Sequence, residues 1–315
     1  MGKEGFQKMV LVKVYIIIPV HNRKAITLQC LDNLQSLGIL DKHKIIVVDD
    51  GSQDGTATAI NNLYPSIIIL TGDGNLWWTG AIKLGMEYAY RQGADYFIWL
   101  NDDTFPLPGT IEGLINACQV QSYRMIVSAQ CYTTADLTVP SYGAVQKVAG
   151  NLVPSHTTTD EIIVGDAVSG NLVCLPRSVI KDIGYPAANQ YPQYGDVPYT
   201  YKAKKWGYNI QAYGAYKAIC MPNTQPQQSW LLGEDSIFSI WQSFFSPKSY
   251  FYFKSHWYWC MTFYGWLGIF VFIRPYWQWC RNAILRWLFP KSFLIYLRNR
   301  RDEFRGVKNI TGNIQ

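Results

Sequence analysis

The chain has 315 residues, of which 49% are hydrophobic, 15% aromatic and only 16% charged. This length fits one large α/β domain with an appendage, or two modest domains, and the apolar composition excludes a disordered chain. The formal charge of +6 is carried by the C-terminal region. Residues 274–315 hold nine Lys or Arg and two acids, a net charge of +7, so residues 1–273 sum to about −1. The basicity is thus a property of the tail, and we expect no nucleic-acid partner.

The N-terminal residues lack the apolar core of a signal peptide, so their Ile-rich run is predicted to be a first strand. We expect the catalytic part of the chain to stay in the cytoplasm. Seven cysteines are widely spaced and form no CxxC pair. They are predicted to be reduced, mostly buried thiols rather than disulfides or zinc ligands.

The first 130 residues alternate β-branched runs with helical patterns. Strands are predicted at 14–19, 45–49, 67–71, 96–100 and 125–129, and helices at 26–37, 56–63, 79–90 and 110–122. This rhythm indicates βαβ units and a mainly parallel sheet covered on both faces. Further along, only a strand at 168–175 and a helix at 197–206 are predicted.

Polar residues follow four consecutive predicted strands. They are His21-Asn22, Asp49-Asp50, Asp73-Gly74-Asn75 and Asn101-Asp102-Asp103. Ligands of such sheets bind where the strands end at their carboxyl edge, so these residues predict a binding site there.

Asp102 and Asp103 are adjacent carboxylates at the end of an apolar run. Like charges at this separation repel, so the pair is expected to bind a proton or a cation. The segment VVDDGSQDGT imitates the start of a calcium loop, but Asn61 stands where a bidentate Glu is needed. The first strand is followed by PVHNRKA instead of a GxGxxG fingerprint, which disfavours NAD or FAD.

Four segments in register carry a family resemblance: IIIPVHNR, IIVVDDGSQDGT, LWWTGAIKLGMEYA and FIWLNDDTFPLPGTI. Together they resemble the nucleotide-sugar-binding half of family 2 glycosyltransferases, which have a GT-A fold. LNDDT, with Pro108 five residues beyond Asp103, is similar to rhamnosyltransferase-like members. The resemblance covers about residues 12–220.

The resemblance implies roles for matching residues. Asp103 is expected to ligate Mn²⁺ or Mg²⁺, and Asp102 to reach the ribose or a metal-bound water, although Asn101 replaces the first acid of a strict DxD motif. Asp50 is expected to accept a hydrogen bond from the base. The first-strand loop, expected against the nucleotide, consists of Pro19, Val20 and Asn22.

The resemblance also implies a catalytic base, Asp196 in QYGDVPYTYKAKKWGY, although Gly195 replaces the Glu that usually precedes it and Pro198 the acid that follows. A partly desolvated carboxylate can take the proton of an acceptor hydroxyl. Asp166 and the pair Glu234-Asp235 are the alternative bases.

Five further residues are candidate contacts of the nucleotide sugar. Trp78 is expected to stack on a ring or simply to pack, and Lys83 to touch a phosphate or remain solvated. Gly80 permits close approach of the backbone to a ligand or a strand. Gly170 and Asn171 lie in SGNLVCLPRSVI, which resembles the acceptor-side segment of the family.

The tail from residue 244 is a separate aromatic module, so we expect a catalytic domain at 1–243 and a helical module at 244–315. Nineteen uncharged residues lie between Lys254 and Arg274, with arginines and aromatics interleaved beyond them. We expect helices in the cytoplasmic membrane interface, with arginines meeting anionic lipid. A single span, a buried helical hairpin and a homodimer interface are the alternatives.

The sequence thus predicts an inverting, metal-dependent glycosyltransferase. The expected donor is a nucleoside-diphosphate sugar, first dTDP-rhamnose and second a UDP-hexose, and the expected acceptor is lipid-linked or a growing glycan. A sugar nucleotidyltransferase would need a Gly-rich basic loop after the first strand, which PVHNRKA does not supply. A catalytically silent membrane-binding module is the alternative from another class.

Overall fold

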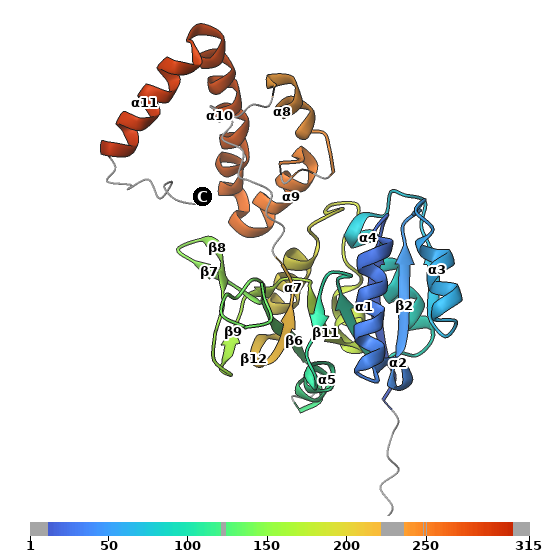
Figure 1. Cartoon of the computed structure of the whole chain (residues 1–315). Helices are drawn as coiled ribbons and strands as arrows, with labels where there is room; N and C mark the ends of the chain where they lie inside the picture. Colours follow the sequence, from blue (N-terminus) through green and yellow to red (C-terminus); the bar gives the residue numbers. More distant parts are fainter. Residues whose placement is uncertain (1–11, 121–123, 222–235, 248, 250, 305–315) are drawn as a thin grey trace, which may run out of the picture. The chain divides into compact units, whose positions relative to one another are not determined.

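The structure, a computed structural model, describes residues 12–120, 124–221, 236–247, 249 and 251–304. The chain divides into two compact units, Met1–Asn223 and Thr224–Gln315 (Figure 1). The sequence placed the boundary after residue 243. Helix α8 (Ile237–Ser243) instead lies in the second unit, so that unit begins earlier than its aromatic composition indicates.

Four parallel strands build the N-terminal half of the main sheet, in the order β3-β2-β1-β4. Their bounds are β1 Val14–Val20, β2 Lys44–Asp49, β3 Ile68–Thr71 and β4 Tyr96–Leu100. The helices between them are α1 Lys24–Ser36, α2 Ile39–Lys42, α3 Thr56–Leu63 and α4 Trp77–Arg91. All four strands therefore present their carboxyl ends at one edge, as the sequence predicts.

The other half of the sheet is mixed. Strand β11 (Leu172–Pro176) runs antiparallel between β4 and β6 (Met125–Tyr132), and β12 (Asn209–Ile219) is parallel to β6. Two short strands, β5 (Phe105–Pro106) and β9 (Ile162–Val164), pair antiparallel with β12. A smaller sheet has the order β10-β7-β8, with bounds Ala167–Val168, Ala144–Val148 and Asn151–Ser155.

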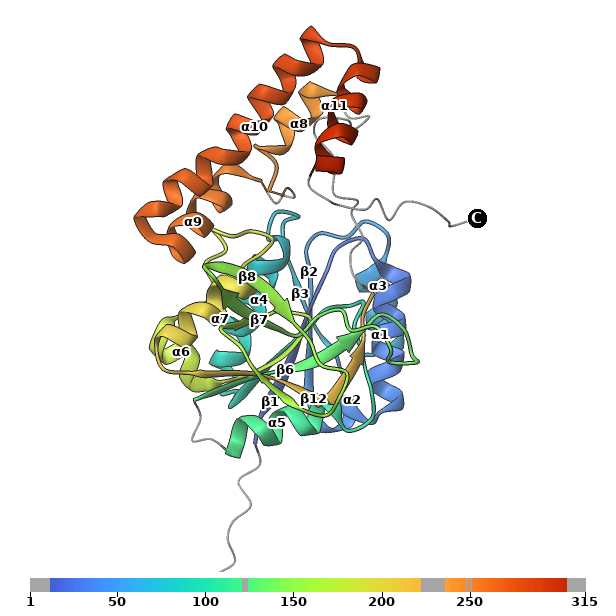
Figure 2. The ribbon, with the colours of Figure 1, turned by 90° about the vertical axis from the view of Figure 1, so that its left-hand side faces the viewer.

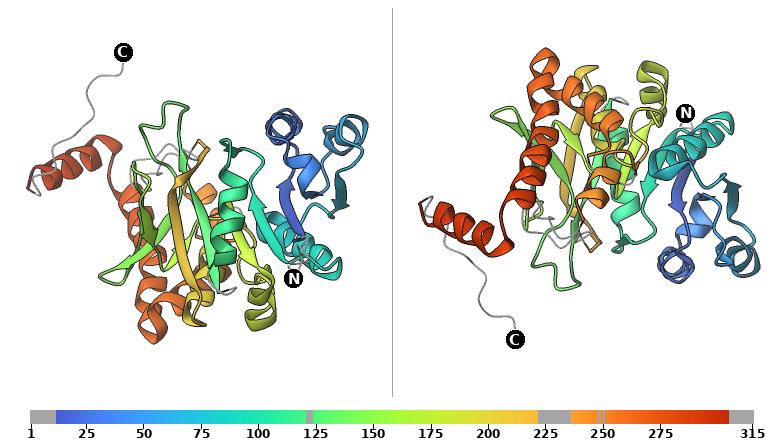
Figure 3. Two further views of the ribbon diagram at one scale, coloured as in Figure 1. Left: turned by 90° about the horizontal axis from the view of Figure 1, so that it is seen from below. Right: turned by 90° about the horizontal axis from the view of Figure 1, so that it is seen from above.

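Helices cover both faces of the main sheet because its central strands are apolar on both sides. In β1, Ile16 and Ile18 pack into one core, whereas Tyr15 and Ile17 pack into the other. The first core includes α1, α2, α3 and α5 (Thr110–Val120). The second includes α4, α6 (Arg177–Ile183) and α7 (Asp196–Lys205). These layers lie on opposite sides of the strands in Figure 2 and Figure 3.

The predicted strand at 168–175 is wrong in one respect, because it is divided into β10 and β11. The interruption, residues 169–171, contains Gly170. A Cβ atom built at Gly170 would lie 2.6 Å from the Trp78 ring and 2.9 Å from Cβ of Asp196. The break therefore lets the backbone approach two predicted site residues.

The second unit consists of helices. After α8 come α9 (Phe253–Tyr264), a 3₁₀ turn (Gly265–Leu267), α10 (Gly268–Leu288) and α11 (Lys291–Phe304). His256 of α9 stacks on Phe272 of α10, with ring centroids 5.5 Å apart. In the part of the chain that the structure describes, no helix is both long and apolar enough to cross a membrane.

The thiol prediction is confirmed, because all seven cysteines are free and only Cys280 is exposed.

Candidate active site

The loop after β1 is joined to the loop after β2 at the carboxyl edge. Asn22 adopts a left-handed conformation (φ 52°), donates its backbone N–H to Ser52 Oγ at 2.8 Å, and accepts from the Gln53 N–H at 2.7 Å. Val20 follows Pro19 and is the last residue of β1. Its carbonyl accepts a hydrogen bond from the Asp50 N–H at 2.9 Å. The three predicted first-strand residues are thus built into one edge with Asp50.

Asp50 is buried and holds the loop that leads into α4. Its Oδ1 accepts from the Gly74 N–H at 2.8 Å, and its Oδ2 accepts from the Trp77 N–H at 3.0 Å. A Cβ at Gly72 would lie 2.5 Å from Oδ1, so the loop passes very close to this carboxylate. Asp50 therefore fixes the start of α4, and its expected contact with a base stays a prediction.

The acidic pair lies in a tight turn after β4. The Thr104 N–H donates to the Asn101 carbonyl at 3.0 Å, and the Asn101 N–H donates to the Asn171 carbonyl at 2.9 Å. Asp102 is buried, whereas the Asp103 side chain is 31% exposed. The turn thus points one carboxylate inward and leaves the other accessible.

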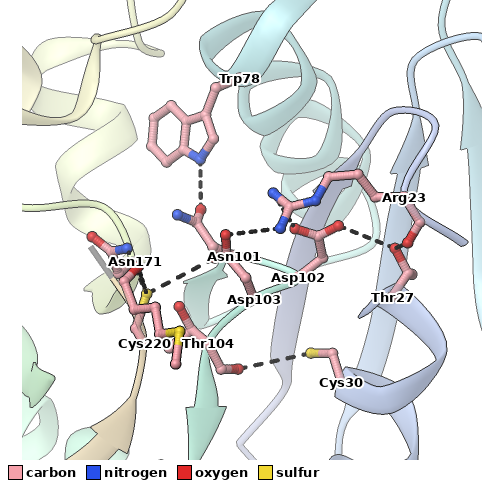
Figure 4. A network of polar contacts seen from close by, with 11 residues as sticks. Arg23, Thr27, Cys30, Trp78, Asn101, Asp102, Asp103, Thr104, Asn171 and Cys220 are labelled. Carbon is pink, nitrogen blue, oxygen red and sulfur yellow. Dashed lines mark hydrogen bonds and ion pairs between the residues drawn. The ribbon is translucent and has the colours of Figure 1, made fainter. Parts of the chain in front are cut away.

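Arg23, at the start of α1, bridges both carboxylates (Figure 4). Its Nη1 lies 3.2 Å from Asp102 Oδ1, and its Nη2 lies 2.9 Å from Asp103 Oδ2. Thr27, one turn further along α1, donates its hydroxyl to Asp102 Oδ2 at 3.1 Å. The acidic pair is therefore held against α1 by a cation of the chain itself.

Burial and ion pairing act in opposite directions on this cluster. Burial raises the pKa of Asp102 to about 6, although the Arg23 guanidinium acts to lower it. Burial lowers the pKa of Arg23, but the Asp102 and Asp103 carboxylates outweigh it and raise that pKa above its usual value. Arg23 therefore stays charged beside the pair.

Cys220 joins the acidic turn to Asn171. Its thiol lies 3.9 Å from Asp103 Oδ1 and accepts from Asn171 Nδ2 at 3.3 Å. Both Cys220 and Asn171 are buried, and burial raises the pKa of the thiol to about 11. The thiol is therefore neutral near pH 7 and does not compete with Asp103 as an anion.

Trp78 and Gly170 connect the acidic turn to Asp196. The Trp78 indole N–H donates to Asn101 Oδ1 at 2.7 Å, and the indole ring lies against Gly170. The Gly170 N–H in turn donates to Asp196 Oδ2 at 2.7 Å. This series of contacts brings together residues from α4, the β4 turn, the β10–β11 break and α7.

The start of α7 is anchored on the same side. The Gly195 N–H donates to Thr79 Oγ1 at 3.0 Å, and the Thr79 N–H donates to the Pro192 carbonyl at 2.9 Å. Burial raises the pKa of Asp196, although the Gly170 N–H and two backbone donors near Asp196 act to lower it. Asp196 is thus a positioned carboxylate with increased basicity.

Some predicted residues do not join this cluster. Lys83 Nζ forms an ion pair with Glu87 Oε1 on α4, at 3.7 Å. Gly80 approaches Leu76, the residue that directly precedes α4. The alternative base Asp166 accepts from the Lys147 N–H at 2.7 Å and so holds β7. The other alternative, Glu234-Asp235, lies outside the described residues.

Arg23, Thr27 and Cys220 have no predicted role from the sequence. A partial signal existed for Arg23, since it directly follows the polar residues at the end of the first predicted strand. Cys220 ends β12 and Thr27 lies within a helix, so only the folded contacts reveal them.

The donor set fits a divalent ion that takes most of its ligands from elsewhere. Among the described residues, no group of three or more His, Cys, Asp or Glu could hold a metal ion. Asp103 is the partly exposed hard-oxygen donor, and Asp102 is engaged by Arg23 and Thr27. Mg²⁺ commonly binds through one or two carboxylates, with phosphates and waters completing its shell.

Comparison with known families shows what this part of the chain resembles. Residues 15–139 match the family model described as glycosyl transferase family 2. This part of the chain therefore resembles a family 2 glycosyltransferase domain. The match includes Asn22, Asp50 and the 101–103 turn, whereas Gly170 and Asp196 lie beyond it.

Two curated relatives are similar to this chain. UDP-N-acetylglucosamine--dolichyl-phosphate N-acetylglucosaminyltransferase of Methanococcus voltae is 26% identical over 132 residues, covering 37% of this chain and 51% of the relative. Glycosyltransferase AglE of Haloferax volcanii is 24% identical over 201 residues, covering 62% and 63%. The chain therefore spans about half the length of the first relative and less than two thirds of the second.

Solved structures support the fold. GalNAc-T7 with UDP, GalNAc and Mn²⁺ gives a TM-score of 0.53 at 13% identity, covering 68% of this chain and 45% of that chain. Mannosyltransferase PcManGT from Pyrobaculum calidifontis, in complex with GDP-Man and Mn²⁺, gives 0.53 at 14% identity, covering 92% and 80%. The predicted α/β GT-A fold is confirmed, and the rhamnosyltransferase-like specificity stays a prediction.

Proposed function

We propose that this protein is an inverting, metal-dependent glycosyltransferase that moves a sugar from a nucleoside diphosphate to a lipid-linked or glycan acceptor. One observation carries the proposal. The accessible carboxylate Asp103 and the partly desolvated carboxylate Asp196 belong to one network, through Cys220 and the Asn171-Gly170 backbone. Sugar transfer needs an accessible carboxylate that can hold a metal ion near the diphosphate leaving group. It also needs a basic carboxylate that can take the proton of the attacking hydroxyl, at the same edge of the sheet.

Asp103 is the proposed ligand of Mn²⁺ or Mg²⁺. A divalent ion bound there neutralises negative charge on the departing diphosphate. The two structural neighbours are complexes that contain Mn²⁺ together with UDP or GDP-Man, which supports the proposal for this chain. Arg23 and Thr27 hold Asp102 and so orient the turn that carries Asp103.

Asp196 is the proposed general base. The acceptor oxygen attacks the anomeric carbon, the bond from that carbon to the diphosphate oxygen breaks, and the hydroxyl proton passes to Asp196. Attack opposite the leaving group inverts the anomeric centre without a covalent intermediate on the enzyme. Because Asp196 Oδ2 is held by the Gly170 N–H, the carboxylate has a fixed direction in which to accept the proton.

The proposed donors are dTDP-rhamnose first and a UDP-hexose second. The name of the Methanococcus relative gives UDP-N-acetylglucosamine as its donor and dolichyl phosphate as its acceptor. That name supports a uridine nucleotide as the second donor and a lipid-linked phosphate as the acceptor to examine. Trp78, Gly170 and Asn171 are proposed to border the donor sugar, because they lie between Asp103 and Asp196 in the network.

Peripheral binding to the cytoplasmic face of a membrane is the proposed location. The described helices of the second unit expose large aromatic side chains, with Trp266 78%, Trp277 67% and Trp287 83% exposed. Interfacial helices combine such aromatics with arginines, as α10 does with Arg281 and Arg286. A homodimer and the absence of a nucleic-acid partner stay predictions.

A donor screen tests the proposed activity. The protein is incubated with dTDP-rhamnose, UDP-hexoses and GDP-mannose with Mn²⁺, and slow donor hydrolysis is followed as released nucleoside diphosphate. Hydrolysis of one donor, lost in the Asp103→Ala variant, is the expected result. Calorimetry with UDP and dTDP accompanies it. A protein that binds neither nucleotide, with or without Mn²⁺, is a silent module and contradicts the proposal.

A further inference from the structure

Arg23 occupies the place where a cation is expected. Its guanidinium contacts Asp102 Oδ1 at 3.2 Å and Asp103 Oδ2 at 2.9 Å (Figure 4). We propose that Arg23 is a resident counter-cation of the acidic pair, which weakens binding of a divalent ion alone and makes that ion bind together with the diphosphate. This inference rests on the proposed function and adds to it a determinant of ion binding.

The oxygen atoms of the pair are already largely engaged. Arg23 contacts one oxygen of each carboxylate, and Thr27 donates to the second oxygen of Asp102. The remaining oxygen, Asp103 Oδ1, is contacted by the distant Cys220 thiol, 3.9 Å away. A free ion would therefore meet one available carboxylate oxygen, too few ligands for tight binding without phosphate oxygens.

The charges lead to the same conclusion. Two carboxylates and one guanidinium sum to −1, so the pair attracts a divalent ion far less than two free carboxylates would. Within the described residues, Arg23 is the one basic side chain that forms an ion pair with Asp102 or Asp103. The Arg23 side chain is 45% exposed and Asp102 only 4%, so solvent screens the guanidinium only in part.

Divalent-ion binding alone gives the direct test. Mn²⁺ is titrated into wild type, Arg23→Gln, Arg23→Lys and Arg91→Gln by calorimetry and by electron paramagnetic resonance. Arg91 is a matched control, because it is an exposed arginine. It is the last residue of α4, whereas Trp77 is the first. We expect Arg23→Gln to bind Mn²⁺ about tenfold more tightly than wild type, since the neighbouring positive charge is removed.

The other variants separate charge from folding. Arg23→Lys keeps the positive charge and should leave Mn²⁺ affinity within about threefold of wild type, and Arg91→Gln should not change it. Adding Asp103→Ala to Arg23→Gln should abolish the gain, which locates it at this pair. Thermal unfolding of each variant shows whether the fold is retained. If Arg23→Gln does not fold, wild type itself still tests the inference, because equal Mn²⁺ affinity with and without nucleotide would overturn it.

Coupling to nucleotide gives a second readout. In each protein, Mn²⁺ affinity is measured with saturating UDP or dTDP and again without nucleotide. The gain in affinity that nucleotide produces should be about tenfold smaller in Arg23→Gln than in wild type, because the ion no longer depends on the diphosphate. Mn²⁺ affinity that is unchanged or lower in Arg23→Gln overturns this inference alone, provided that wild type binds nucleotide with Mn²⁺. Failure of wild type to bind any nucleotide overturns the proposed function, and this inference with it.

Discussion

At the scale of single residues, Asp196 is the group whose environment most directly suggests chemistry. Its carboxylate is partly withdrawn from water, which raises its pKa, and it has a fixed backbone donor in Gly170. Desolvation increases basicity, and the hydrogen bond sets direction, so both requirements of a general base are met by neighbouring atoms. Asn at this position can accept the same Gly170 N–H but cannot take a proton.

The Asp196→Asn substitution therefore separates binding from transfer. We expect nucleotide affinity within about threefold of wild type and a fall in kcat of about 10²–10⁴, the usual contribution of general-base catalysis. Calorimetry with UDP and dTDP plus Mn²⁺ measures the first, and single-turnover transfer measures the second. Turnover near the wild-type rate would assign the base to another residue, and loss of nucleotide binding would give Asp196 a structural role.

Asp196 also predicts a dependence of stability on pH. Its raised pKa means that the folded state holds this proton more tightly than the unfolded state does. The measured quantity is the free energy of unfolding of wild type minus that of Asp196→Asn. This difference should fall as pH rises from the ordinary pKa of Asp to the raised pKa of Asp196, and it should stay constant at higher pH. Urea denaturation of both proteins between pH 3.5 and 7 measures this difference. A difference that grows with pH would contradict burial as the dominant influence.

The sequence indicates the candidate site residues that belong to a motif, and it does not indicate those that are brought to the site by a contact in the folded chain. Asp103 and Asp196 are recognisable because strand ends and a helix start mark them. Arg23 lies 80 positions before Asp103, so their ion pair exists only after β1 and β4 become neighbours in the sheet. Its partner could not be deduced from composition or spacing.

At the scale of elements, α4 shows how a helix is fitted to the sheet below it. A Cβ at Gly85 would lie 2.4 Å from Cγ2 of Ile17 in β1 and 3.3 Å from Cγ2 of Val48 in β2. The nearest atom to a Cβ at Gly80 is Cβ of Leu76, at 3.2 Å. The first glycine permits close packing on two strands, whereas the second meets the side chain that directly precedes its own helix.

These two glycines give a matched pair of substitutions. Gly85→Ala should lower the free energy of unfolding by about 1–3 kcal/mol, because the methyl group overpacks the core. Gly80→Ala should stay within about 1 kcal/mol of wild type, because the gain in helix propensity offsets a small shift of Leu76. Guanidinium denaturation measures both. Equal destabilisation by the two would contradict a special packing role for Gly85.

The elements that the sequence predicted are those with continuous apolar runs. Strands β1, β2 and β4 are buried on both faces and were found within one residue at each end. Strand β12 was missed, because several of its buried positions are small residues, Ala212, Gly214 and Ala218, which give little apolar alternation in the sequence. Strand β8 was missed too, since it is largely exposed and includes Pro154. Partly solvated strands are stabilised by pairing partners, which a local pattern does not contain.

At the scale of the whole molecule, the chain combines an α/β unit, of which residues 15–139 match the family 2 glycosyltransferase model, with a second unit of helices. The second unit is small, and many of its large apolar side chains are exposed, as in α10 with Phe270, Ile273 and Ile284. Exposed apolar surface of this extent is typical of an interaction site. A lipid-linked acceptor would be reached most readily by an enzyme that already binds the membrane surface.

Tryptophan substitution in α10 and the turn before it tests this arrangement. A triple variant with Trp266, Trp277 and Trp287 changed to Ala should bind vesicles containing anionic lipid at least about tenfold more weakly, because buried aromatic area contributes to interfacial affinity. Trp206→Ala is the control, since Trp206 is 54% exposed but lies in the first unit. Vesicle co-sedimentation at low and high salt gives the affinities. Unchanged binding of the triple variant, or equal weakening by Trp206→Ala, would show that these helices do not mediate membrane contact.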